Sequence, residues 1–319
     1  MNEPAPDLLH LGAADIARLL PPAAAADAVE AALRGGLDPE DCPPRTQVTV
    51  PAGQLLLMPA TAGGHAGVKI AGVAPANPAR GLPRITGGYL LLDARTLVPL
   101  ALLDGAALTA LRTPAVSAVA LRQLAAPDTS HAVIFGAGPQ AYGHLEAALA
   151  ERPLTRVTVV SRRTEHAERL AAHARALGPH ARTGTPDDVA GADLVLCCTT
   201  AREPLFDGRL VPDHATVIAV GSHEPDARET DTALVRRSAV YVEARAAARR
   251  EAGDLLVPEA EGAVGPDHIR GTLAELVTGR TGPDAGRPQL FKSVGMAWED
   301  LAVAAAVHRA ATTGAGGET

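Results

Sequence analysis

The chain has 319 residues, which is enough for two domains with ample hydrophobic cores. Its formal net charge of −7 at pH 7 gives no reason to expect general affinity for nucleic acid. Its three cysteines show neither metal-ligand spacing nor a disulfide framework, and no apolar run is long enough to cross a membrane. We therefore expect a cytoplasmic protein with no metal, nucleic-acid or membrane partner.

The N-terminal stretch, to residue 40, favours helices, because apolar residues recur at helical spacing over 13–20 and 23–34. Short strand-like runs follow and predict a mostly antiparallel sheet; they cover 46–50, 54–58, 67–73, 88–92 and 97–103. A helix is then expected over 106–112, with a new helical start at Pro114.

A buried strand over 132–135 is expected to end in the turn Gly136-Ala137-Gly138-Pro139-Gln140-Ala141, with a helix beyond it. This G-x-G-x-x-A pattern is typical of dinucleotide-binding sites. Gly136 allows a sharp turn, and Gly138 allows a pyrophosphate to approach the backbone. The helix that starts at Pro139 and Gln140 offers free N–H groups in its first turn, from Gln140 onward because proline has none. The alternative is an ordinary glycine turn in an α/β protein.

The next apolar run, 156–160, ends in Ser161-Arg162-Arg163-Thr164. Sites that prefer NAD usually carry an acidic residue here, which binds the ribose 2′-OH. A guanidinium instead pairs with a 2′-phosphate through two hydrogen bonds. This corner therefore predicts NADP(H) as the preferred cofactor, with NAD(H) possible. The alternative is that Arg162 and Arg163 form a solvated basic corner.

Strand-like and helical segments alternate after the glycine turn, which predicts parallel strands with right-handed crossovers. The strands are expected over 192–198, 216–220, 239–242 and 289–292, and the helices over 165–177, 232–236, 246–252 and 296–311. The tail, 314–319, is expected to fray. The fold class predicted is α/β, a Rossmann-type domain beside an α+β domain.

Five segments, in this order, carry a resemblance to a known family: LMPA (57–60), LRTPAVSA (111–118), FGAGPQA (135–141), AVGSHEPDARE (219–229) and FKSVGMAWED (291–300). They resemble the ornithine cyclodeaminase/mu-crystallin family. The resemblance implies a Rossmann NAD(P)-binding domain at 115–296. It also implies a substrate-binding and dimerisation domain built from both chain ends, 1–114 and 297–319, and hence a homodimer.

Family substrates are α-amino or α-imino acids, and the resemblance implies that Arg45, Lys69 and Arg112 bind their carboxylate. Lys69 lies in an apolar strand, where an unpaired ammonium would be very costly, and it is also a candidate proton donor to the substrate nitrogen. Arg112 lies in an apolar helical run and suits bidentate recognition of a carboxylate. The alternative for each is a surface residue whose charged end reaches solvent.

The loop at 222–226 helps to distinguish two types of reaction within this family. In the cyclodeaminases an aspartate of this loop acts on the substrate amino group, and alignment on Pro225 and Glu229 puts His223 at its position. The pattern is closer to the ketimine reductase type, in which that aspartate is also absent. His223 is therefore a candidate catalytic proton donor, or else a loop residue without a role.

The remaining cofactor-binding candidates follow from the resemblance: Thr113, Thr199, Val220, Gly221, Ser293 and Gly295. In the family the helix that carries Thr113 and Ser117 faces the cofactor, and the segment with Ser293 and Gly295 lies close to the nicotinamide. The alternatives are small residues that allow helix packing and a simple strand-to-helix turn.

The function expected is an NADP(H)-dependent oxidoreductase that reduces a cyclic ketimine, of the pyrroline- or piperideine-2-carboxylate type, to the imino acid. Three alternatives stay open. They are a linear amino-acid dehydrogenase acting on alanine, arginine or an N-carboxyalkyl amino acid, an ornithine or lysine cyclodeaminase, and a non-catalytic NADPH-binding protein. Substrate profiling with and without ammonia would separate the first alternative, release of ammonia without net change in the nicotinamide would indicate the second, and NADPH binding without oxidation would indicate the third.

Overall fold

The computed structural model describes residues 8–314, which form two compact units. One unit contains the chain up to Ala115 and again from Met296 onward, and the other is Val116–Gly295. Of the tail expected to fray, residues 315–319 lie outside the described residues, as do residues 1–7 of the first expected domain.

The first unit is built on a six-stranded sheet in the order β1-β6-β5-β4-β3-β2. All neighbouring strands are antiparallel except β1 and β6, which confirms the mostly antiparallel sheet. A strand at the N-terminus was not expected, because that stretch was predicted to be helical. The strands are β1 (Leu9–Leu11), β2 (Thr46–Val50), β3 (Gly53–Ala62), β4 (His65–Val73), β5 (Ile85–Asp93) and β6 (Pro99–Asp104).

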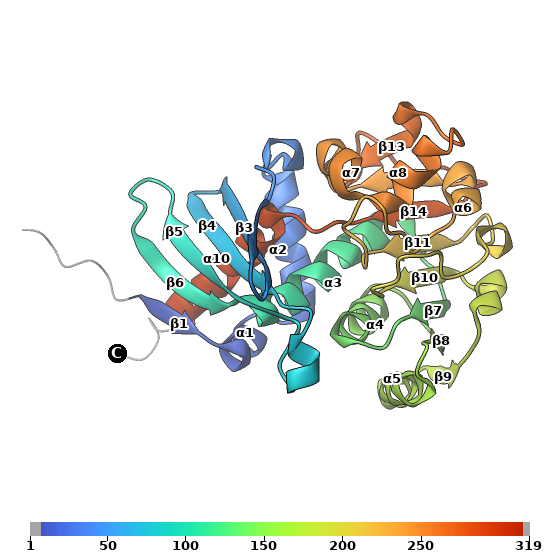
Figure 1. Ribbon diagram of the computed structural model, residues 1–319, viewed down its shortest axis with the longest axis horizontal. Helices are drawn as coiled ribbons and strands as arrows, with labels where there is room; N and C mark the ends of the chain where they lie inside the picture. Colours follow the sequence, from blue (N-terminus) through green and yellow to red (C-terminus); the bar gives the residue numbers. More distant parts are fainter. Residues whose placement is uncertain (1–7, 315–319) are drawn as a thin grey trace, which may run out of the picture. The chain divides into compact units, whose positions relative to one another are not determined.

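Three α-helices lie wholly in this unit: α1 (Ala13–Leu19), α2 (Pro22–Arg34) and α10 (Ala297–Gly314). Pro22 is the first residue of α2, a position where its missing N–H costs nothing. Figure 1 shows α10 lying across the sheet, and it packs against β3, β4, β5 and α2. The side chains of β3 alternate, so that Leu56, Met58 and Ala60 are buried.

Helix α3 (Gly105–Leu124) runs without interruption through Pro114, and the predicted break there is wrong. A proline inside a helix removes one backbone hydrogen bond and costs about 3 kcal/mol. Ala115, Val116 and Ala118–Leu121 are all buried, however, and this burial outweighs the loss.

The second unit is an eight-stranded parallel sheet in the order β13-β12-β14-β11-β10-β7-β8-β9, which confirms a Rossmann-type arrangement. Two strands were not predicted, namely β9 and β13, which are short and carry polar residues at the sheet edges. The strands are β7 (His131–Phe135), β8 (Arg156–Val160), β9 (His180–Thr183), β10 (Leu194–Cys197), β11 (Thr216–Ala219), β12 (Ala239–Val242), β13 (Ile269–Thr272) and β14 (Gln289–Lys292).

The α-helices that lie wholly in this unit are α4 (Pro139–Glu151), α5 (Thr164–Ala176), α6 (Thr232–Arg237), α7 (Arg245–Glu251), α8 (Gly253–Ala260) and α9 (Leu273–Val277). Strands β7, β10, β11, β12 and β14 are buried along their whole length, as expected for a parallel sheet covered on both faces. Over residues 8–314, no helix combines the length and the apolar character that a membrane span needs.

Candidate active site

The predicted cofactor-binding residues of the second unit gather at one edge of its sheet. Gly136, Ser161 and Thr199 follow the carboxyl ends of β7, β8 and β10 closely. Val220 and Gly221 follow β11, and Ser293 follows β14. Because parallel strands end at the same edge, these residues line the edge at which open α/β sheets bind ligands.

The glycine turn has the backbone that its sequence predicts. Gly136 has a φ of +102°, and a Cβ there would lie 2.4 Å from the carbonyl oxygen of Cys198. A Cβ on Gly138, the N-cap of α4, would meet nothing within 4 Å. The backbone conformation at position 136 therefore requires glycine. At Gly138 there is open space at the start of a helix, where backbone N–H groups can donate hydrogen bonds to a phosphate.

The basic corner lies at the start of the next helix. Thr164 is the first residue of α5 and Arg163 is its N-cap. Arg162 and Arg163 are both exposed, so their guanidinium groups can contact a ligand on the surface. The exposure also suits a solvated corner, so the cofactor preference stays a prediction.

A buried carboxylate that was not predicted joins two of the loops. Glu229 Oε1 accepts hydrogen bonds from the backbone N (2.8 Å) and Oγ1 (2.7 Å) of Thr199, and Oε2 accepts one from Gly221 N (2.7 Å). Glu229 is fully buried. Burial raises the pKa of its carboxyl, and the nearby Lys292 ammonium opposes that rise. Glu229 thus ties together the loops that follow β10 and β11.

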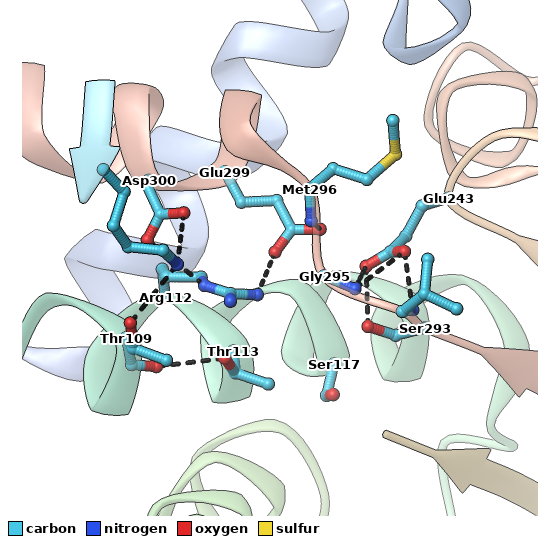
Figure 2. Close-up of polar contacts among 12 residues, drawn as sticks. Thr109, Arg112, Thr113, Ser117, Glu243, Ser293, Gly295, Met296, Glu299 and Asp300 are labelled. Atoms are coloured by element: carbon cyan, nitrogen blue, oxygen red, sulfur yellow. Dashed lines mark hydrogen bonds and ion pairs between the residues drawn. The ribbon is translucent and has the colours of Figure 1, made fainter. Parts of the chain in front are cut away.

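A second buried carboxylate holds the segment after β14. Glu243 accepts hydrogen bonds from Ser293 Oγ (2.6 Å) and Gly295 N (3.2 Å), as Figure 2 shows. It also accepts one from Val294 N (2.8 Å). Gly295 has a φ of +73°, which favours glycine at this corner. The Ser293 hydroxyl is therefore engaged in shaping its own turn.

Lys292 and Asp254 form an ion pair with both side chains fully buried, Nζ to Oδ2 at 2.9 Å. Lys292 Nζ also donates to the carbonyl oxygen of Ser222 (2.7 Å). Asp254 Oδ1 accepts from the backbone N of Glu229 and of Thr230, both at 2.8 Å. Burial acts to raise the pKa of Asp254, but Lys292 and these hydrogen bonds outweigh it and the pKa is lowered. The pair fixes the loop that carries His223.

The first unit holds a buried cluster of four charges. Lys69 Nζ lies 2.7 Å from Asp300 Oδ2, and Arg112 Nε lies 3.4 Å from Asp300 Oδ1. Arg112 Nη1 is in close contact with Glu299 Oε2. The two acids are completely buried, and the side chains of Lys69 and Arg112 are 5% and 8% exposed. Figure 2 shows the acids on α10 directed at Arg112 on α3.

Burial lowers the pKa of Lys69, and the positive charge of Arg112 lowers it further. Asp300 and Glu299 act in the opposite direction. An ammonium with a lowered pKa gives up its proton more readily, which suits the predicted role of Lys69 as a proton donor.

Three further residues with predicted roles do not belong to the charged cluster. Arg45 is half-buried just before β2. Thr113 is buried, and its hydroxyl donates to the carbonyl oxygen of Thr109 one turn earlier (3.0 Å). His223 is exposed, on a loop where Arg202 forms ion pairs with Glu224 and Asp226. The roles predicted for these three residues stay predictions.

Six buried charged residues had no role predicted from the sequence, namely Glu229, Glu243, Asp254, Lys292, Glu299 and Asp300. The available signal was a charge placed next to an apolar run. Glu243 and Lys292 directly follow or end buried strands, and Glu299 and Asp300 begin an apolar helix. An apolar run next to a charge does not indicate which side chain neutralises that charge in the folded protein.

Comparison with known proteins places the chain in a family. The sequence profile of the ornithine cyclodeaminase/mu-crystallin family matches residues 9–315. The ketimine reductase mu-crystallin of Mus musculus is 35% identical over 233 residues, 73% of this chain and 72% of the relative.

Two solved structures are similar over nearly the whole chain. One is Thermococcus litoralis Delta(1)-pyrroline-2-carboxylate reductase in complex with NADH and L-proline, with 32% identity, a TM-score of 0.90, and coverage of 97% of this chain and 98% of that one. The other is an archaeal alanine dehydrogenase dimer with bound NAD, with 27% identity, a TM-score of 0.91, and coverage of 96% and 97%. The chain belongs to the ornithine cyclodeaminase/mu-crystallin family.

Proposed function

We propose that this protein reduces a cyclic ketimine carboxylate, of the pyrroline- or piperideine-2-carboxylate type, to the imino acid, and that it prefers NADPH to NADH. At the coarser level the chain is an NAD(P)-dependent oxidoreductase that acts on C–N bonds, as its reductase relatives are. The observation that carries the finer proposal is the buried cluster of Lys69 and Arg112 with Glu299 and Asp300.

The charges of this cluster favour a ligand that is itself a zwitterion. Lys69 and Arg112 are matched by Glu299 and Asp300, so the four side chains carry no net charge. A carboxylate bound beside them adds a negative charge, which is costly in a buried site unless it is compensated. The protonated nitrogen of a cyclic ketimine supplies that compensation within the ligand. Arg45 is the third cation that we assign to the carboxylate.

The residues at the sheet edge of the second unit fit a dinucleotide, because the Gly136 backbone excludes a side chain and the start of α4 is open at Gly138. We assign dinucleotide binding to this unit and substrate binding to the other. A bound NAD(P)H supplies the hydride for the C=N carbon. The proton that makes the ring nitrogen cationic comes from Lys69 Nζ, and the hydride then adds to the adjacent carbon, so that one proton and one hydride in total convert C=N to CH–NH.

The preference for NADPH is supported by the exposed Arg162 and Arg163 at the start of α5. Their fork of donors suits a 2′-phosphate. Residues 161–164 include no carboxylate, the group that would bind a ribose 2′-OH.

We further propose a homodimer formed through the sheet of the first unit. The face of the sheet opposite α10 carries Val48, Ile70 and Leu102, which are 43%, 44% and 38% exposed. Strand β2 is also exposed along its whole length at the sheet edge. Apolar faces and open edges of this kind are usually covered in the native assembly.

A second candidate is a linear amino-acid dehydrogenase, which the likeness to the archaeal alanine dehydrogenase favours. One panel separates the candidates: oxidation of NADPH and NADH by the wild-type protein with pyrroline-2-carboxylate, with piperideine-2-carboxylate, and with 2-oxo acids plus ammonia. Activity on the cyclic imines without ammonia supports the proposal. Activity only on 2-oxo acids with ammonia supports the dehydrogenase. Release of ammonia from ornithine or lysine without net NADH oxidation would instead indicate a cyclodeaminase, and NADPH binding without turnover a non-catalytic protein.

A further inference from the structure

The chain uses lysine at two positions only. Of its 29 basic residues, all are arginine except Lys69 and Lys292. Both lysines are buried, and each forms an ion pair with a buried aspartate, Lys69 with Asp300 and Lys292 with Asp254. Arginine stays protonated in proteins, whereas a buried lysine can lose its proton. Among the lysines and arginines of the chain, Lys69 and Lys292 are therefore the two side chains that can change their charge by releasing a proton.

Asp300 contacts both cations of the cluster from one position on α10. Its Oδ2 accepts a hydrogen bond from Lys69 Nζ (2.7 Å), and its Oδ1 lies 3.4 Å from Arg112 Nε. Lys69 Nζ also donates to Thr109 Oγ1 at 3.4 Å, a much longer contact. Asp300 is thus the side chain that most directly sets where the ammonium points.

Glu299, the residue before Asp300, contacts Arg112. Its Oε2 is in close contact with Arg112 Nη1, and its Oε1 accepts a hydrogen bond from Met296 N (3.0 Å) at the start of the helix. Glu299 therefore anchors the guanidinium to the first turn of α10.

The groups that face Lys69 come from three elements: Asp300 and Glu299 from α10, Arg112 from α3, and Tyr89, its register partner on β5. Burial and Arg112 work against a charged lysine, and Asp300 is the foremost group that works for it. We propose that Asp300 is a positioning residue that keeps Lys69 protonated and aimed for proton delivery, whereas Glu299 positions Arg112 for the ligand carboxylate.

This inference rests on the proposed function, and it predicts different effects for two neighbouring acids. Asp300→Asn removes the charge next to Lys69, so Lys69 loses its proton at lower pH. The alkaline limb of the kcat/KM profile then moves to lower pH. Glu299→Gln loosens Arg112 and should raise the KM of the imine by roughly tenfold, the usual size for a hydrogen bond to a charged group. The alkaline limb of the kcat/KM profile should move less in Glu299→Gln than in Asp300→Asn. Asp15→Asn, at an exposed ion pair with Arg18, is the control and should change neither.

A titration that needs no turnover tests the same point. The full chain is labelled with 13C at the lysine ε-carbon, which gives two side-chain signals, and Lys292→Arg assigns them by removing one. In Asp300→Asn the Lys69 signal should titrate at lower pH than in the wild type, with a smaller change in Glu299→Gln and none in Asp15→Asn. The Lys292 signal should keep its position and reports that the fold is intact.

An unchanged Lys69 titration in folded Asp300→Asn would overturn the inference, as would an equal shift in Glu299→Gln. If Asp300→Asn does not fold, the wild-type chain labelled at the aspartate carboxyl carbons decides the question. The Asp300 signal should then respond when the Lys69 signal titrates, and an Asp300 signal that does not respond to the titration of Lys69 would overturn the inference. If the wild type reduces no cyclic imine, the proposed function fails, but the lysine titration still decides whether Asp300 controls Lys69.

Discussion

Replacement of Arg112 with methionine should destabilise the first unit strongly. The substitution leaves Glu299 fully buried without the guanidinium that contacts it, while Asp300 keeps Lys69 at 2.7 Å. Removing one partner of a buried ion pair costs about 3–5 kcal/mol, because the other charge is left uncompensated. We expect the free energy of unfolding of this unit to fall by about that amount.

The double variant Arg112→Met Glu299→Met separates stability from function. Methionine at both positions removes both charges and fills a similar volume, a change that is often neutral or stabilising in buried pairs. The double variant should therefore regain most of the stability lost in the single variant. It should not regain imine reduction, because the fork of donors for the ligand carboxylate is still missing. Arg112→Lys should also be nearly inactive, since lysine keeps the charge but not the bidentate geometry.

The assay is urea unfolding followed by the fluorescence of Trp298. This residue is the single tryptophan of the chain, is 2% exposed, and lies next to Glu299 on α10. Its signal therefore reports on the unit that is perturbed. Arg18→Met, which breaks an exposed pair with Asp15, is the matched control and should change little. The reasoning is refuted if Arg112→Met is as stable as the wild type, or if the double variant is as unstable as the single one.

Three further outcomes are expected. Replacing Arg162 and Arg163 with Asp and Ser should raise the KM for NADPH and leave that for NADH little changed; a wild-type preference for NADH would contradict the cofactor proposal. Light scattering should give the mass of two chains for the wild type. Ile70→Asp should shift the measured mass towards that of one chain, because the dimer would have to bury the added carboxylate in its interface. A wild-type mass of one chain at micromolar concentration would exclude the dimer. Glu229→Gln should weaken NADPH binding roughly tenfold in a fluorescence titration, because its amide NH2 would face the N–H of Gly221; unchanged binding would remove Glu229 from the support of that loop.

Local patterns were sufficient for most of the secondary structure. The apolar run at 132–135 and the glycine turn after it predicted β7 and the start of α4, because both depend on neighbours in the chain. The same reasoning failed at Pro114, where burial of α3 outweighs a local preference, and at β9 and β13, whose short polar runs carry no clear strand signal.

The sequence by itself determined that the charges of Lys69 and Arg112 need compensation, from a partner charge or from solvent, because an isolated charge in an apolar run is too costly to bury. Only the tertiary structure decided that these partners are Asp300 and Glu299, which lie 231 and 187 residues further along the chain. Likewise, the sequence placed Thr199 and Gly221 after strands, and the folded sheet brought Glu229 between them. The physical reason is that periodicity and turn chemistry act over a few residues, whereas charge neutralisation depends on distances in space that only the packed elements define.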